Sequence, residues 1–161
     1  MMNLNTNYSP ESKVWIYQSS RPFTEEEISA INDQLAIFTK QWTAHNAQLQ
    51  AQGNIIEDRL ILLIVDETHT AASGCSIDTS VHFIKLLEKK FNVDLFDRTL
   101  VNFYRDGTLS SVHLHDLPEL FAAHVINEET QVIDPLVNSK ATFDTNFKTA
   151  LGNSWMKNFL Q

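Results

Sequence analysis

The sequence predicts a single α/β domain in which helices pack on one mixed sheet of about five strands. Three observations lead to this fold class. The chain has 161 residues, close to the usual size of one domain. Segments with the helical spacing of apolar residues alternate with short β-branched and aromatic runs. Glycine and proline number only four each, which argues against disorder. We therefore expect a globular domain over residues 13–161 and a flexible tail over residues 1–12.

The first elements are a short strand at residues 14–17 and a long helix. The helix has the clearest start signal in the chain, because Thr24 and Glu27 match a capping box. Its apolar face then repeats at intervals of three and four residues. The residues on this face are Ile28, Ile31, Leu35, Phe38, Trp42, His45 and Leu49. Gly53 is predicted to end the helix.

The middle of the chain contains the most apolar segment. Residues 60–65, Leu-Ile-Leu-Leu-Ile-Val, form an unbroken apolar run, which is typical of a central strand covered on both faces. A second helix is predicted from about Asp78, and Asp106-Gly107 is a strong hairpin signal. The other expected elements are strands at 100–104, 108–115 and 131–133, a short helix capped by Asp116, and a final helix carrying Phe143, Phe147 and Leu151. The expected order is β-α-β-α-β-β-α-β with a helical tail.

Composition excludes several classes of function. The net charge is −8 and no basic run occurs, which argues against a nucleic-acid binder. No stretch reaches the roughly 18 apolar residues of a membrane span. The polar start has no secretory signal pattern, and a single cysteine, Cys75, fits a reducing compartment. We therefore expect a cytoplasmic protein, and the sequence indicates no cofactor.

The apolar run ends in Asp66-Glu67, as a Walker B strand does. In nucleotide hydrolases such a pair binds Mg²⁺ and polarises water. The phosphate loop Gly-x-x-x-x-Gly-Lys-Ser/Thr is absent from this chain. We therefore interpret the pair as two solvated acids at the end of a buried strand.

Three segments carry a resemblance to a known family: residues 41–45, Gln-Trp-Thr-Ala-His; residues 72–78, Ala-Ser-Gly-Cys-Ser-Ile-Asp; and residues 96–98, Phe-Asp-Arg. Together they resemble a family of small bacterial proteins often labelled "ABC transporter ATPase", from Val14 nearly to the C-terminus. The resemblance implies no mechanism. The label itself would require a phosphate loop and a Leu-Ser-Gly-Gly-Gln signature, and this chain has neither.

The turn before the second helix is the candidate site. Amide groups at a helix start stabilise anions, so Cys75 could be a thiolate nucleophile there. His45 would act as its base, and Asp78 or Arg98 would orient the groups. The ligand-binding candidates are Ser73, Gly74, Ser76 and Arg98. The alternatives are a buried structural cysteine, a helix-end histidine and an arginine that pairs with a local acid.

Two histidines form a second candidate. Residues two apart on a strand share a face, so His113 and His115 could bind a transition metal. No third ligand has a recognised spacing, and we assign no metal site.

These patterns leave three functions open. The first is a domain that binds a small ligand or a protein partner, with a second copy of the chain among the partners. The second is a thiol-dependent enzyme or redox protein that uses Cys75. Nucleotide binding, which the family label suggests, is the third.

Overall fold

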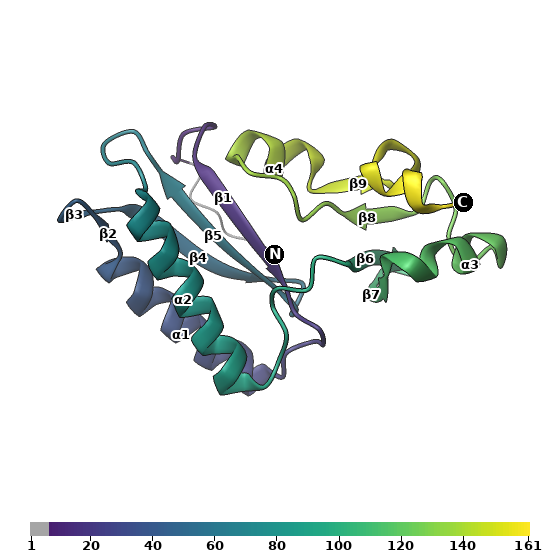
Figure 1. The fold of residues 1–161 in the computed structure, drawn as a ribbon, viewed down its shortest axis with the longest axis horizontal. Coiled ribbons are helices and arrows are strands. Elements are labelled where there is room, and N and C mark those ends of the chain that lie inside the picture. Colours follow the sequence, from purple (N-terminus) through teal and green to yellow (C-terminus); the bar gives the residue numbers. More distant parts are fainter. Residues whose placement is uncertain (1–6) are drawn as a thin grey trace.

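The strands form two main antiparallel sheets, with helices on the outer face of one and between them (Figure 1). The computed structural model describes residues 7–161. The first sheet has the order β1 (Lys13–Gln18), β5 (Leu60–Asp66), β4 (Gln50–Ile56). The second has the order β7 (Thr108–His113), β6 (Leu100–Arg105), β8 (Gln131–Ile133), β9 (Lys148–Ala150). A small hairpin pairs β2 (Thr43–Ala44) with β3 (Ala47–Gln48).

The predicted α/β class and the single domain are confirmed, but the single mixed sheet is wrong. Each strand pair within residues 7–161 is antiparallel. Both edges of β5 are taken, by β1 on one side and β4 on the other. The outer edge of β1 meets the chain again at Ser139. The later strands therefore pair with one another and form a second sheet.

Strand β5 separates two layers of core, as its unbroken apolar run predicts. Ile61, Leu63 and Val65 pack with helices α1 (Glu25–Gln41) and α2 (Gly74–Phe91). The alternate residues Leu60, Leu62 and Ile64 pack with Phe143 and Phe147 at α4 (Lys140–Asn146). All six residues of β5 named here are fully buried. A strand that is covered on both faces has no solvent face, so it needs no polar alternation.

Helix α1 begins as predicted and ends much earlier than predicted. Thr24 and Glu27 form the capping box, with both reciprocal hydrogen bonds present. The helix ends at Gln41, because Trp42 is extended and the next turn is left-handed, with φ 51° at His45 and 64° at Asn46. The apolar residues beyond Gln41 that matched helical spacing flank the β2–β3 hairpin. This hairpin brings Leu49 back to the core that also contains Trp42.

Gly53 lies in β4 and does not end a helix. A Cβ atom at this position would lie 2.9 Å from Leu35 Cδ2 and 3.2 Å from Leu63 Cδ2. Helix α1 crosses the sheet here so closely that no side chain fits. The glycine is therefore explained by packing between elements that are distant in sequence.

The remaining elements follow the predictions with shifted boundaries. Asp106-Gly107 forms the hairpin turn between β6 and β7, with φ 53° and 77°. Helix α2 begins at Gly74, earlier than predicted. In α3 (Leu117–Ala122), Asp116 makes no capping hydrogen bond, so that prediction is wrong. The predicted final helix is the short α4, after which the chain becomes β9 and a 3-10 turn containing buried Leu151.

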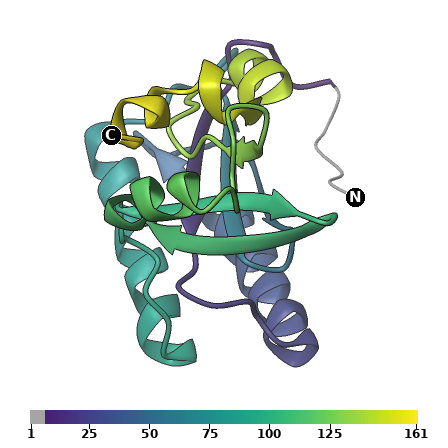
Figure 2. The ribbon, with the colours of Figure 1, turned by 90° about the vertical axis from the view of Figure 1, so that its right-hand side faces the viewer.

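The second sheet packs its β6–β7 hairpin beside α3 and the C-terminal turns (Figure 2). Its core includes Val101, Phe103 and Met156. No helix within residues 7–161 combines the length and the apolar character that crossing a membrane requires.

The predicted tail is only partly within the structure. Residues 1–6 lie outside the described residues. Tyr8 and Ser12 are buried, and the backbone N–H of Ser9 donates to Asp66 Oδ2 at 2.9 Å. Residues 8–12 therefore pack on the domain, and the domain boundary does not fall at residue 12.

Candidate functional site

The residues predicted to bind a ligand at the start of α2 mainly build the helix start. The Ser73 hydroxyl accepts from the Ser76 backbone N–H at 3.1 Å, and the Ser76 hydroxyl accepts from the Ser73 backbone N–H at 2.7 Å. Ser76 is buried. A Cβ at Gly74 would meet nothing within 4 Å, so no close approach requires a glycine there. The local sequence is therefore explained by capping.

Cys75 lies in the first turn of α2 and is exposed. The alternative of a buried structural cysteine is therefore wrong. The first turn of α2 contains no acidic residue, so the positive end of the helix dipole is not neutralised there. Asp78 is exposed one turn further along the helix. A thiol in this position can meet a reagent from solvent.

The residues predicted as partners of Cys75, namely His45, Asp78 and Arg98, are all exposed. His45 is exposed in the β2–β3 turn, and within residues 7–161 no hydrogen bond joins it to Cys75. Arg98 is exposed in the turn before β6. None of the predicted site residues lines the cavity at residues 55–58 and 143–148 or the smaller one between Phe121 and Lys157. The structure therefore shows an accessible thiol in the first turn of α2.

The acids at the end of β5 stabilise the loop that follows. Asp66 Oδ1 accepts from the Thr68 hydroxyl at 2.5 Å and from the Thr68 N–H at 2.9 Å. These bonds, with the one from Ser9, lower the pKa of the Asp66 carboxyl. Glu67 accepts from the Ala72 N–H at 2.7 Å and lies 3.5 Å from Lys13 Nζ. Asp66 is buried and internally bonded, which differs from the solvated acid that we expected.

His113 and His115 lie side by side but do not converge. Their rings are stacked with centroids 5.5 Å apart and planes only 7° apart. The nitrogen lone pairs of imidazole lie in the plane of the ring. In two parallel stacked rings, the lone pairs therefore lie in separate parallel planes and do not point at one metal ion. The His113 Nδ1 atom faces Thr99 Oγ1 at 3.1 Å and Asp97 Oδ2 at 3.5 Å. In the described part of the chain, no three His, Cys, Asp or Glu side chains are grouped as metal ligands.

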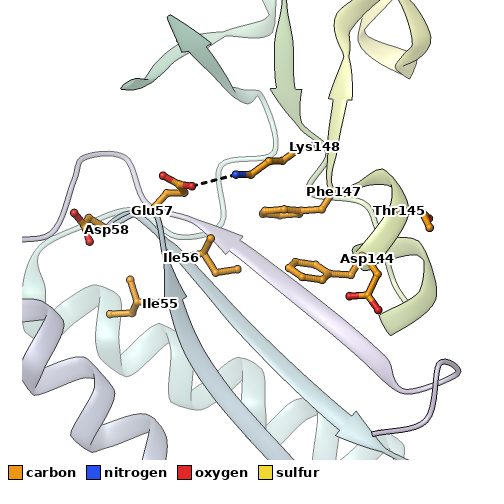
Figure 3. Close-up of a pocket in the computed structure, with 9 residues that line it drawn as sticks. Ile55, Ile56, Glu57, Asp58, Asp144, Thr145, Phe147 and Lys148 are labelled. Carbon is orange, nitrogen blue, oxygen red and sulfur yellow. Dashed lines mark hydrogen bonds and ion pairs between the residues drawn. The ribbon is translucent and has the colours of Figure 1, made fainter. Parts of the chain in front are cut away.

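The larger cavity lies elsewhere, between the two sheets. It has a volume of about 650 Å³ and lies where the β4–β5 turn faces α4 and β9 (Figure 3). The turn contributes Glu57 and Asp58, and β9 contributes Lys148. The full lining is Ile55, Ile56, Glu57, Asp58, Phe143, Asp144, Thr145, Phe147 and Lys148.

Glu57 is the polar centre of this cavity. Its Oε1 accepts from the Tyr104 hydroxyl at 2.9 Å and lies 3.4 Å from Lys148 Nζ. The Lys148 ammonium is also 4.9 Å from the centroid of the Tyr104 ring. Burial raises the pKa of the Tyr104 hydroxyl, and the adjacent Tyr104 hydroxyl raises the pKa of Lys148. At neutral pH the phenol is therefore protonated and the lysine is charged.

The backbone of the turn is unusual for its residue types. Glu57 has φ 52° and Asp58 has φ 59°, both in the left-handed region. Tight hairpin turns of this kind favour Asn, Asp and Gly, so Glu57 is the residue whose type does not suit this backbone. The sequence instead places two carboxylates at the cavity.

The cavity floor is apolar. The rings of Phe143 and Phe147 are 4.5 Å apart between centroids, and both residues are buried. Ile56 is also buried and contributes to the same core. In Figure 3 the Phe147 ring and Ile56 lie below Glu57 and Lys148. A group that enters from solvent would therefore meet an apolar surface and a charged rim.

Comparison with models of known protein families, with curated proteins and with solved structures found no match for this chain. The family resemblance of the three segments therefore remains a prediction, and the site must be judged from its geometry.

Sequence reasoning missed this cavity for an identifiable reason. We predicted residues 50–53 as the end of a helix, which left residues 57–58 without a strand on their N-terminal side. Two acids between a pair of apolar strands would have indicated a charged hairpin turn. No sequence signal places that turn beside Lys148, which is 91 residues away.

Proposed function

We propose that this protein is a small-ligand-binding domain, and that the cavity between the β4–β5 turn and the α4–β9 segment is its binding site. The observation that carries the proposal is the left-handed backbone at Glu57, a residue type that rarely adopts it. Strained conformations of non-glycine residues concentrate at functional sites, where the side chain is needed. Here the strained residue Glu57 lines a cavity of about 650 Å³, within the size range of small-molecule sites.

This proposal adopts the first of the three functions that the sequence left open, a ligand-binding domain, but places the site in the cavity and not at the start of α2. The start of α2 offers capping residues and an exposed thiol, whereas the cavity offers an apolar floor with a few convergent polar groups. The second arrangement is typical of small-molecule sites. The domain would bind its ligand without catalysis.

The test is a search for ligands by thermal shift with a variant that blocks the cavity. Thr145 lines the cavity on α4 and is exposed, so Thr145→Trp fills the space from the solvent side. Thr79→Trp is the matched control. Both threonines are exposed on a helix, and each hydroxyl donates to the carbonyl four residues earlier, at 3.0 Å and 2.9 Å.

A fragment library is screened for compounds that raise Tm, since a ligand of the folded state stabilises it. We expect compounds that raise the Tm of the wild type and of Thr79→Trp, and that lose this effect in Thr145→Trp. Compounds that stabilise all three proteins equally bind outside the cavity. A library in which every stabilising compound behaves in that way would refute the proposal.

A second candidate function is thiol chemistry at Cys75, supported by its exposure in the first turn of α2. Helix amide groups stabilise a thiolate and speed its reaction. The rate of alkylation by iodoacetamide is measured on the folded protein and on an unstructured peptide of residues 72–78. A faster reaction of the folded protein supports the thiol function, and an equal or slower reaction removes it. Cys75 is the only cysteine, so the signal reports one site.

A further inference from the structure

We propose that the cavity selects an organic cation, namely an ammonium or guanidinium group attached to an apolar body. The inference rests on the proposed function and assigns the chemical class of the ligand. Its basis is the charge balance of the lining, the internal cation already bound there, and the apolar floor.

The lining carries three carboxylates and one ammonium. Lys148 pairs with Glu57, and Asp144 pairs with Lys140 Nζ at 2.8 Å on the same helix. The Asp58 carboxylate has no hydrogen bond or ion pair within residues 7–161, although its backbone carbonyl accepts from Phe23. One negative charge is therefore left without a partner at the rim. An anionic ligand would meet three carboxylates, whereas a cationic ligand would meet an unpaired one.

Lys148 shows how an ammonium binds at this place. Its Nζ lies between the Glu57 carboxylate and the face of the Tyr104 ring, a combination that favours cations. The ion pair is long, at 3.4 Å, and the two side chains are 48% and 36% exposed. Exposed pairs of this kind contribute little, so a ligand cation can take the place of Lys148 at low cost.

The apolar floor of the cavity determines the chemistry of the part of the ligand that carries no charge. The rings of Phe143 and Phe147, with Ile56, provide an apolar surface below the charged rim. A small hydrated inorganic cation would leave that surface in contact with water. An organic cation with an aryl or alkyl group covers it and gains from burying apolar area. Amphipathic amines therefore match both parts of the cavity.

The experiment compares three probes of nearly equal shape: 2-phenylethylamine as the cation, 2-phenylethanol as the neutral compound and phenylacetate as the anion. Binding is measured by titration calorimetry and by ligand-observed NMR at low salt. We expect the amine to bind most tightly. Asp58→Asn should weaken amine binding about fivefold, the size expected for one exposed charge pair. Lys148→Met removes the competing ammonium and should strengthen amine binding by a similar factor.

Asp106→Asn is the matched control for Asp58→Asn. Asp106 is also an exposed aspartate with φ 53° in a tight hairpin turn, and it lies in the β6–β7 turn away from the cavity lining. We expect it to leave amine binding unchanged. Tm is recorded for each variant, so that loss of fold is distinguished from loss of affinity.

The outcomes separate the two proposals. Tightest binding by phenylacetate, with loss of binding in Lys148→Met, would overturn the cation assignment and leave the cavity as a ligand site. Equal binding of the three probes would also overturn it. If no probe binds, the assignment is overturned, and the fragment screen with Thr145→Trp then decides separately whether the cavity binds any ligand.

Discussion

Single residues explain the firmest local feature of the chain, the start of α1. The Glu27 side chain accepts from the Thr24 backbone N–H at 2.9 Å and from the Arg21 guanidinium at 2.8 and 2.9 Å. These bonds, the one from Arg21 first, lower the pKa of Glu27 from its ordinary value of 4.5 to about 2. The carboxylate is therefore more stable in the folded state than in the unfolded chain.

This carboxylate should make stability depend on pH in a defined window. A group with a depressed folded pKa stabilises the fold above its unfolded pKa. Its contribution should be complete above about pH 5 and lost between pH 4.5 and about 2. We expect Glu27→Gln to lower the free energy of unfolding by about 1 kcal/mol at pH 7, with a difference from the wild type that shrinks as the pH falls through this window.

Urea unfolding at pH 7, 4 and 3 measures this difference. Glu26→Gln is the matched control, because Glu26 is exposed in the same helical turn and has no hydrogen bond or ion pair within the described chain. An equal loss of stability in both variants would show that general charge in the first turn, and not the pairing of the Glu27 carboxylate with Arg21, stabilises α1.

At the scale of elements, the contact between α1 and β4 depends on Gly53. An alanine Cβ would lie 2.9 Å from Leu35 Cδ2 and 3.2 Å from Leu35 Cβ. Leu35 is fully buried, so its side chain has no open space to move into. The helix therefore packs on the backbone of the strand itself.

We expect Gly53→Ala to destabilise the protein by about 1–3 kcal/mol, because the helix or Leu35 must shift in a close-packed core. Gly74→Ala provides the comparison, since a Cβ there meets nothing within 4 Å and alanine favours a helix. Chemical unfolding of both variants measures the difference. A Gly53→Ala protein as stable as the wild type would show that α1 adjusts freely on the sheet.

At the scale of the whole molecule, a buried polar network connects the two sheets. Gln18 on β1 donates to the Leu100 carbonyl at 3.0 Å and accepts from Asn102 Nδ2 at 2.7 Å. The Ser111 hydroxyl donates to Asn102 Oδ1. Gln18 is 5% exposed and Asn102 is fully buried. Because buried polar groups need partners, the network selects one arrangement of the sheets.

Removing one member should leave the other unsatisfied. We expect Asn102→Leu to cost about 2–3 kcal/mol and Gln18→Leu to cost a similar amount. The double variant should cost less than the sum, because it leaves neither of the two amides unpaired. A double-mutant cycle by urea unfolding measures the coupling. Strictly additive losses would mean that the two amides stabilise the sheets independently.

The arrangement of the sheets also determines whether the proposed site exists. Glu57 lies in the turn that joins β4 and β5 of the first sheet, whereas Tyr104 and Lys148 belong to strands of the second. A change that shifts one sheet on the other would separate the carboxylate from the phenol and the ammonium. Ligand binding at the cavity therefore depends on the packing of the two sheets against each other, and not on any single element.

The sequence by itself determined the features whose causes lie within a few residues of one another. The capping box at Thr24, the apolar strand at residues 60–65 and the Asp106-Gly107 hairpin were predicted and are confirmed. The reason is that their hydrogen bonds and turn conformations depend on neighbours in the chain. At the predicted site, the same local chemistry produced a helix start and an exposed Cys75.

The tertiary structure decided the features that depend on residues far apart. The spacing of Trp42 and Leu49 along the chain fits a continuous helix. In the structure α1 ends before Trp42, and the Trp42 indole N–H donates to the Ser76 carbonyl at 2.8 Å, a contact between residues distant in sequence. Gln18 and Asn102 are 84 residues apart, and Glu57 and Lys148 are 91 apart. Contacts over such separations form when sheets and helices bury their apolar faces against one another. The periodicity of apolar residues predicts that each element has an apolar face, but it does not predict which two faces pack together.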